Sequence, residues 1–257
     1  MNTAETLKII SERLVRENIC LSPLSENAIQ TISEFMRLRN ANSELMRRLS
    51  NVELNYVQIH SEASDACTDA AQAKDAIVRS FKSLINLWNS KGYISGFTFS
   101  FNEKNADIMR ADFSFTIESI QIDLNVFSKA LMTLGETSAQ MRACSASFME
   151  IYHESKLAVY AAMLNRDREE ILDCRAISLQ SHASANESSR ASAHYLGIAK
   201  SCTRIFSLIN TLITEISYSL YSDLSDTYRA RLFSPTVISN KITEAIRNLE
   251  YINIEIN

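Results

Sequence analysis

The chain has 257 residues, with four Gly, two Pro and a formal net charge of −4. An apolar content of 46% with 22% charged residues excludes an intrinsically disordered chain, because there is enough apolar surface for a core. Few Gly and Pro predict few turns and therefore long elements. The acidic balance, with no basic cluster beyond Arg37, Arg39, Arg47 and Arg48, argues against a nucleic-acid partner.

A short amphipathic helix is predicted over 2–17, and a long helix over about 24–90 follows Pro23. Apolar residues inside the long helix recur at alternating steps of four and three, which is a heptad seam for packing against other helices. The residues of this seam are Leu45, Leu49, Val52, Tyr56, Ile59, Ala63, Ala66, Ala70, Ala73 and Ile77. Its Ala-rich part predicts close approach of a neighbouring helix.

The period changes from helical to two after Gly92, which is expected to end the long helix. Two runs of apolar residues that alternate with polar ones, 97–101 and 113–117, are joined by a polar loop. This pattern predicts a β-hairpin inserted over 92–122. An isolated hairpin is marginally stable in water, so its aromatic face must be covered. Two interpretations remain open: a hairpin folded down on the helices, or a mobile apolar tongue at one end of them.

Helical periodicity resumes near Asn125. The charged run 165–170 is interpreted as either a bend or a solvated helix face, and a turn is predicted near Asn186 in a Ser-rich stretch. A further helix is expected over 187–232, and Pro235 separates it from a last short helix over 236–254. The predicted fold is all-α: an elongated, coiled-coil-like bundle of long helices with one inserted β-hairpin. No linker divides the chain, so residues 1–257 are expected to form one domain, with 92–122 as a subdomain.

No catalytic, cofactor-binding or metal-binding residue is predicted. Glu150 and His153 form an E-x-x-H pair, but a di-iron bundle needs a second such pair and two more inward Glu. The Cys residues are scattered without a C-x-x-C, and four Gly leave little room for a phosphate-binding loop. The sequence therefore predicts a protein that is not an enzyme and needs no cofactor.

The first ten residues lack both a basic stretch and an apolar block, so no cleaved signal peptide is predicted. No run of 18 or more apolar residues exists. Secretion by a route that needs no cleaved leader is expected, with a cytoplasmic location as the alternative.

This layout resembles the cytolysin A-type α-helical pore-forming toxins and their multi-component relatives. The resemblance is one of architecture over the whole chain, and it rests on the seam over 45–77, the Ala-rich part over 63–73 and the hairpin over 92–122. It implies a helical bundle that hides an apolar tongue until the tongue meets a membrane or a partner subunit. Because the predicted hairpin is amphipathic, the resemblance implies one component of a multi-part toxin and not a self-sufficient pore.

The resemblance assigns membrane contact to the apolar residues of the tongue and hinge motion to two Gly. The tongue residues are Tyr93, Ile94, Phe97, Phe99, Phe101, Phe113, Phe115 and Ile117, and the hinge residues are Gly92 and Gly96. Expected partners are other protein subunits, in a homo- or hetero-oligomer, and a lipid membrane. The alternative function is a non-enzymatic structural protein: a secretion-apparatus tip or translocator-like protein, a viral component or a coiled-coil scaffold.

Overall fold

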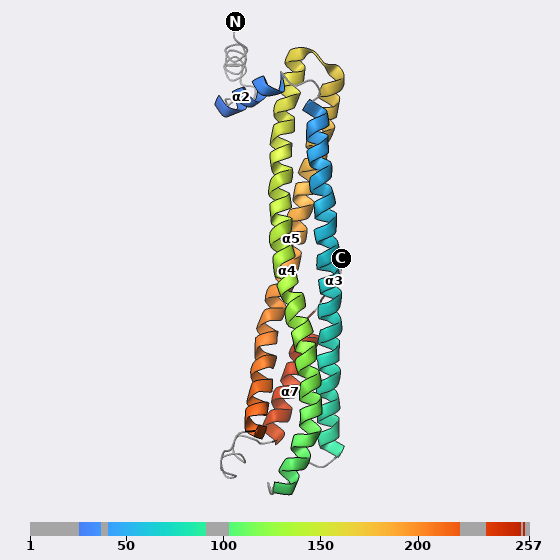
Figure 1. The fold of residues 1–257 in the computed structure, drawn as a ribbon, viewed down its shortest axis with the longest axis vertical. Coiled ribbons are helices and arrows are strands. Elements are labelled where there is room, and N and C mark those ends of the chain that lie inside the picture. The colour runs from blue at the N-terminus through green and yellow to red at the C-terminus, as the bar shows by residue number, and fades with distance from the viewer. Residues whose placement is uncertain (1–25, 37–40, 91–102, 222–234, 253, 255–257) are drawn as a thin grey trace. The chain divides into compact units, whose positions relative to one another are not determined.

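The computed structural model describes residues 26–36, 41–90, 103–221, 235–252 and 254 (Figure 1). Every element in these residues is an α-helix, which confirms the all-α prediction. The helices are α2 (Glu26–Phe35), α3 (Ala41–Ser90), α4 (Glu103–Asn165), α5 (Arg168–Tyr221) and α7 (Pro235–Glu250). The predicted helix over 2–17 lies outside the described residues.

The prediction of a single helix over 24–90 is wrong, because α2 ends at Phe35 and the next described helix begins at Ala41. Ile32 of α2 is fully buried and packs with Ala161 near the end of α4 (Figure 1). Phe35 and Met36 pack at the same place. Burial of this apolar face against α4 gives α2 a packing partner of its own.

The predicted strand over 113–117 is also wrong, because these residues lie within α4. In a strand, Phe115 and Ile117 would share one face, whereas in a helix they point about 200° apart. Phe115 is 80% exposed and Ile117 only 5%. Ile117 begins a buried stripe with steps of three and four that continues through Ile120, Leu124 and Phe127. The helical spacing of this buried stripe extends over more residues than the alternating run 113–117, so it is the better indicator of the secondary structure here. The predicted first strand, 97–101, lies outside the described residues.

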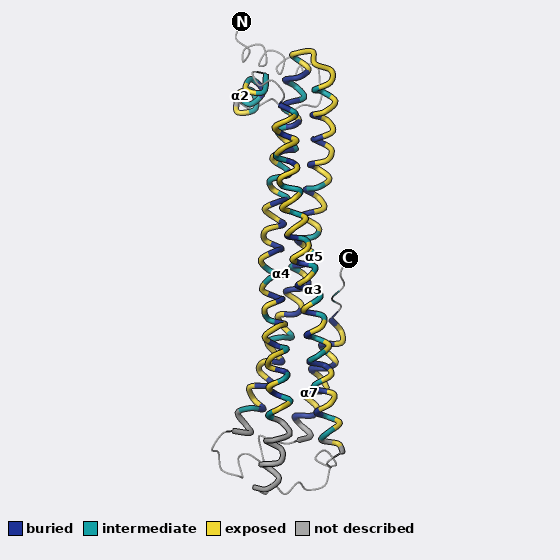
Figure 2. The backbone as a smooth tube through the Cα atoms, turned by 45° about the vertical axis from the view of Figure 1, so that its right-hand side comes forward, coloured by how far each residue is buried: buried dark blue, intermediate teal, exposed yellow. Residues whose placement is uncertain are grey.

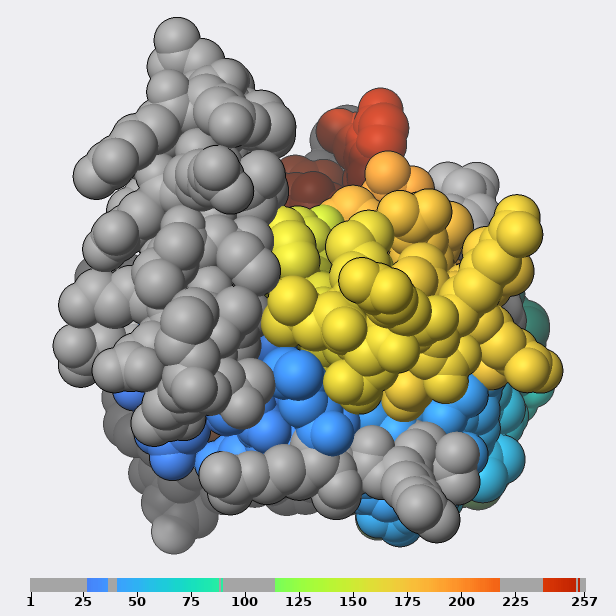
Figure 3. Space-filling model, turned by 90° about the horizontal axis from the view of Figure 1, so that it is seen from above, coloured from blue at the N-terminus to red at the C-terminus, as the bar shows by residue number. Residues whose placement is uncertain are grey.

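The charged run 165–170 forms the bend between α4 and α5, one of its two predicted interpretations. Arg166 adopts a positive φ of 58°, and the Asp167 amide donates to the Ala162 carbonyl at 3.0 Å. The Asp167 carboxylate accepts from the Glu170 amide at 3.0 Å, as an N-cap does. The turn is at the surface, where Figure 3 shows it in yellow.

The predicted turn near Asn186 is wrong, since α5 runs without a break from Arg168 to Tyr221. The Ser residues that suggested a turn instead let α4 and α5 approach closely. Ser188 Oγ donates to the Met141 carbonyl at 2.6 Å, and Ser145 Oγ donates to the Ala185 carbonyl at 2.9 Å. A stretch rich in small polar residues is typical of a loop, but here the Ser hydroxyls bond the backbone of the neighbouring helix and allow close helix packing.

Replacing Ser188 with Leu should lower the free energy of unfolding by about 1–3 kcal/mol, because the larger side chain cannot fit between the two backbones. Ser189→Leu is the matched control, since Ser189 is exposed on the same helix. Urea denaturation followed by circular dichroism measures both. Equal losses in the two variants would contradict the close α4–α5 approach.

Contacts divide the chain into two compact units, the first comprising Met1–His60 with Ala139–Ser192. Within it, α3 runs parallel to α5: Asn42 bonds Asp173 at 2.8 Å, and Gln180 bonds Glu53 at 2.7 Å. The α4 helix runs antiparallel to α3, because Arg48 pairs with Glu154 and Asn55, further along α3, donates to the earlier Cys144. Buried apolar residues of the three helices form the core: Leu45, Leu49, Phe148, Ile151, Cys174 and Ile177.

The second unit comprises Ser61–Ser138 with Ala193–Asn257 and adds α7 to segments of α3, α4 and α5. The α7 helix begins at Pro235, as Pro at a first helical position allows. It runs antiparallel to α5, because Lys241 pairs with Glu215 while Asn248 lies beside Ile205. Lys82 of α3 bonds Glu250 at the end of α7 at 2.6 Å. Figure 2 shows the buried faces of both units in dark blue. The prediction of one domain over 1–257 stays a prediction.

Candidate functional site

The E-x-x-H pair is not part of a ligand cluster in the described part of the chain. Glu150 and His153 are both exposed on α4. Among the described residues there is no group of three or more His, Cys, Asp or Glu side chains placed to hold a metal ion. The ring of His153 lies 5.2 Å from the ring of its neighbour Tyr152 on α4, and the ring of His182 on α5 lies 4.8 Å from the same Tyr152 ring, so His182 contributes to an aromatic contact between α4 and α5.

The predicted tongue residues fall into three groups. Tyr93, Ile94, Phe97, Phe99 and Phe101 lie outside the described residues, as do the hinge residues Gly92 and Gly96. Phe113 lies in α4. Phe115 points away from the packed face of α4 and Ile117 into it. The prediction treated the last two as equivalent, and the structure separates them.

The outward face of α4 carries an exposed apolar strip that the sequence interpretation missed. Phe115, Ile122 and Val126 follow one another at steps of seven and four, so they lie on one face, and they are 80%, 64% and 43% exposed. We call these three residues the α4 strip. Because Ile117, Ile120 and Leu124 are buried, this part of α4 is apolar on two faces. A test for two helical stripes in one window would have found it.

Asp123 lies in sequence between Ile122 and Val126 of the α4 strip and is half-buried. Burial raises the pKa of its carboxyl, and the positive charge of Arg79 partly opposes this. The carboxyl therefore takes up a proton at a higher pH than an ordinary Asp. Acidification reduces the negative charge next to the α4 strip.

A second exposed strip lies on α5, in the other unit. Leu172, Ala176, Leu179 and Ala183 recur at steps of four and three and are all exposed. We call them the α5 strip. They lie on the face opposite the buried Cys174, Ile177 and Ser181. The helix therefore has one apolar face inside the unit and another in solvent.

The residues of the predicted packing seam are all on the inward face of α3. Val52 and Tyr56 are half-buried, and the other members are buried. Tyr56 meets the ring of Phe148 edge-on at 6.4 Å. The small residues Ala63 and Ala70 are fully buried, as close packing requires.

The Cys residues in the described helices are all buried thiols. Burial raises the pKa of Cys67, Cys174 and Cys202 to about 11. Burial also raises the pKa of the Cys144 thiol, although the hydrogen bond that Asn55 donates to this sulfur partly opposes the rise. A raised pKa leaves little thiolate at neutral pH, which argues against a nucleophilic role.

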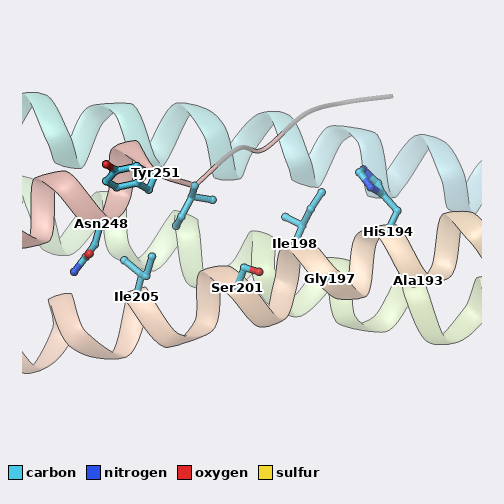
Figure 4. Close-up of a pocket in the computed structure, with 9 residues that line it drawn as sticks. Ala193, His194, Gly197, Ile198, Ser201, Ile205, Asn248 and Tyr251 are labelled. Carbon is cyan, nitrogen blue, oxygen red and sulfur yellow. The ribbon is translucent and has the colours of Figure 1, made fainter.

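A groove of about 730 Å³ lies between α5 and the end of α7, within the second unit (Figure 4). One face of α5 forms its floor and α7 closes one end. Its lining residues are Ala193, His194, Gly197, Ile198, Ser201, Ile205, Asn248, Tyr251 and Ile252. The sequence analysis did not predict this groove, because its lining residues come from two segments that are far apart in sequence.

Neither family models nor curated proteins nor solved structures give a match to this chain. No helix among the described residues is long and apolar enough to cross a membrane.

Proposed function

We propose that this chain is a component of an α-helical pore-forming toxin that binds membranes through the segment 92–122 together with the α4 strip. The observation that supports the proposal is the exposure of Phe115, Ile122 and Val126 on one helix face. Burying such a side chain in an apolar phase gains about 1.5–3 kcal/mol. Three of them on one face suit an interfacial contact in which the helix lies along the bilayer surface.

The proposal assigns the inward face of α4 to folding and the outward face to lipid. Ile117, Ile120 and Leu124 hold α4 in the unit, so the α4 strip can meet lipid without unpacking the core. The aromatic residues of 97–101 precede α4 in sequence, and the largely polar stretch 102–112 separates them from the α4 strip. Partner subunits complete the pore.

Vesicle binding and dye release test the proposal. Phe115→Asp with Ile122→Asp should weaken binding to phosphatidylcholine–phosphatidylserine vesicles by about tenfold or more, because each change removes an apolar contact and adds a charge. The double variant Phe97→Asp with Phe99→Asp should also weaken vesicle binding. Co-sedimentation measures binding, and release of an enclosed dye in the presence of the partner subunits measures pore formation.

Leu179→Asp is the matched control, because Leu179 is 75% exposed but belongs to the α5 strip. It should leave vesicle binding unchanged. Unchanged binding in the α4-strip variants, or equal losses in all variants, would overturn the proposal.

The alternative is a non-enzymatic structural protein that uses its exposed apolar faces for subunit contacts. The α5 strip favours it, since exposed Leu at helical spacing is typical of a helix–helix interface. Under this alternative, Leu179→Asp changes the oligomeric state measured by light scattering, and the vesicles have no effect on any variant.

A further inference from the structure

The α5 strip has the spacing of one strand of a coiled coil. Leu172 and Leu179 are 59% and 75% exposed, and Ala176 and Ala183 lie between and beyond them at steps of four and three. Leu at every second core position is typical of two-stranded parallel coiled coils. The Ala side chains are small, so a second helix can approach α5 closely.

The apolar surface continues from the α5 strip onto α3. Gln180, next to Leu179, donates to the Glu53 carboxylate of α3 at 2.7 Å. Met46 and Val57 lie seven residues before and four residues after Glu53, so they are on the same side of α3. They are 42% and 64% exposed. Exposed apolar residues that gather on neighbouring helices mark an interaction site, whereas scattered ones do not.

Charged and polar residues border the α5 strip on both edges, and the two edges differ in sign. One edge, which we call the basic edge, consists of residues at steps of seven: Arg168, Arg175 and His182. The other, which we call the acidic edge, consists of Asp173, Gln180 and Glu187. All six residues are exposed. In a coiled coil, residues in these flanking positions determine the partner and its orientation.

The charges on both edges are available to a partner. Within the described part of the chain, Arg168, Arg175 and Glu187 form no ion pair. Asp173 accepts one bond, from Asn42 at 2.8 Å. A carboxylate has about four acceptor positions, so Asp173 can accept a further bond from a cation.

The charge pattern favours a second copy of α5 in parallel orientation. In a parallel pair, the basic edge of each helix faces the acidic edge of the other. Arg168 of each copy then faces Asp173 of the other, and His182 faces Glu187. An antiparallel pair would place the two basic edges together and the two acidic edges together, and such like-charge contacts disfavour a complex.

We propose that the α5 strip binds the α5 strip of a second copy of this chain, in a parallel and in-register pair. Leu172 and Leu179 each meet their counterpart across a two-fold axis, as in other isologous interfaces. The inference goes beyond the alternative function above, because it names the partner, the orientation and the register. It rests on neither proposed function, since the α4 strip lies in the other unit, and vesicle binding decides between those functions.

Light scattering over a concentration series tests the pairing. The contact is smaller than a standard interface of about 800 Å² per partner, so we expect a reversible dimer with a dissociation constant of about 10–100 μM. Leu179→Asp should raise this constant about 100-fold or more, because each of the two copies loses a buried Leu contact.

Leu208→Asp is the matched control. Leu208 is 53% exposed on the same helix but lies in the other unit. The variant should keep the dissociation constant of the unmodified chain. A chain that stays monomeric at about 200 μM overturns the proposal. Equal losses of dimer in the two Leu variants overturn it as well.

Engineered disulfides test the orientation and the register. Ala176→Cys and Ala183→Cys, in separate chains, should each form a bond between two copies under mild oxidation, because a disulfide needs Cα atoms about 4.4–6.8 Å apart. In an antiparallel pair a residue meets its own counterpart only at the two-fold axis. Residues 176 and 183 are about 10 Å apart along the helix, so an antiparallel pair can link one of them at most.

Ala143→Cys is the control for these disulfides, because Ala143 is exposed in the same unit but on α4. Cys20→Ser is included in every variant to remove a thiol outside the described residues. Non-reducing electrophoresis measures the fraction of linked chains. Links at both 176 and 183, with none at 143, support the proposal. A link at only one of the two strip positions, no links, or equal links at all three positions overturn it.

A charge reversal gives an independent sign for the orientation. Arg168→Glu should weaken the dimer about 3–10-fold at low ionic strength, because two opposite-charge contacts with Asp173 become like-charge contacts. In an antiparallel pair the same change would place Glu against a basic edge and tighten the dimer. Arg204→Glu, exposed on α5 in the other unit, is the control and should have no effect. A tighter or unchanged dimer in Arg168→Glu overturns the parallel orientation.

Discussion

Replacing Phe148 with Ala should lower the free energy of unfolding by about 3–5 kcal/mol. Phe148 is fully buried in the first unit and meets the Tyr56 ring edge-on at 6.4 Å. Removing it loses the transfer free energy of a large aromatic side chain and leaves a cavity that the long helices cannot fill without bending. Urea denaturation followed by circular dichroism measures the loss.

Phe115→Ala is the matched control, with the same change on the same helix. Phe115 is 80% exposed, so its loss should change the free energy of unfolding by less than about 0.5 kcal/mol. A large loss in this variant would mean that Phe115 is buried in solution, either in the bundle or in an oligomer. A small loss in Phe148→Ala would contradict the packing of the first unit.

These two Phe residues show how far the sequence determines the fold. The seam of α3 was predictable, because steps of four and three persist from Leu45 to Ile77 and leave one face for the core. Phe115 was assigned to a strand because its nearest neighbours alternate. An alternating run of three apolar residues also occurs in a helix that is apolar on two faces, and the buried stripe that begins at Ile117 decides between them.

The break between α2 and α3 and the continuity of α5 were mispredicted for one shared reason. Both depend on what the segment packs against. Ile32 has a partner near Ala161, and Ser188 faces the Met141 carbonyl. Local propensity cannot supply such partners, since they lie far away in sequence. The same holds for the groove, which joins α5 to residues about fifty positions later.

Raising the pH from 9 to 11 should destabilise the protein steeply, through its buried thiols. The pKa of Cys67, Cys174 and Cys202 is about 11 in the folded chain, against an ordinary value of 9.0. The folded state therefore keeps protons that the unfolded state releases as the pH rises above 9. The stabilisation is fully present below pH 9 and is lost as the pH approaches 11, at up to about 1.4 kcal/mol per pH unit for each thiol.

The matched variant carries Cys67→Ala, Cys174→Ala and Cys202→Ala together. Alanine does not titrate, so the loss of stability between pH 9 and 11 should be smaller by several kcal/mol than in the unmodified chain, although the variant starts from a lower stability at pH 7. Urea denaturation at half-unit pH steps gives both slopes. Burial raises the pKa of Tyr195 in both proteins, and the charge of Cys67 adds to this rise only in the unmodified chain, so the difference between the slopes still originates from the thiols. Equal slopes of the free energy of unfolding against pH in the two proteins would contradict the prediction. They would show that the three thiols have the same pKa in the folded chain as in the unfolded one.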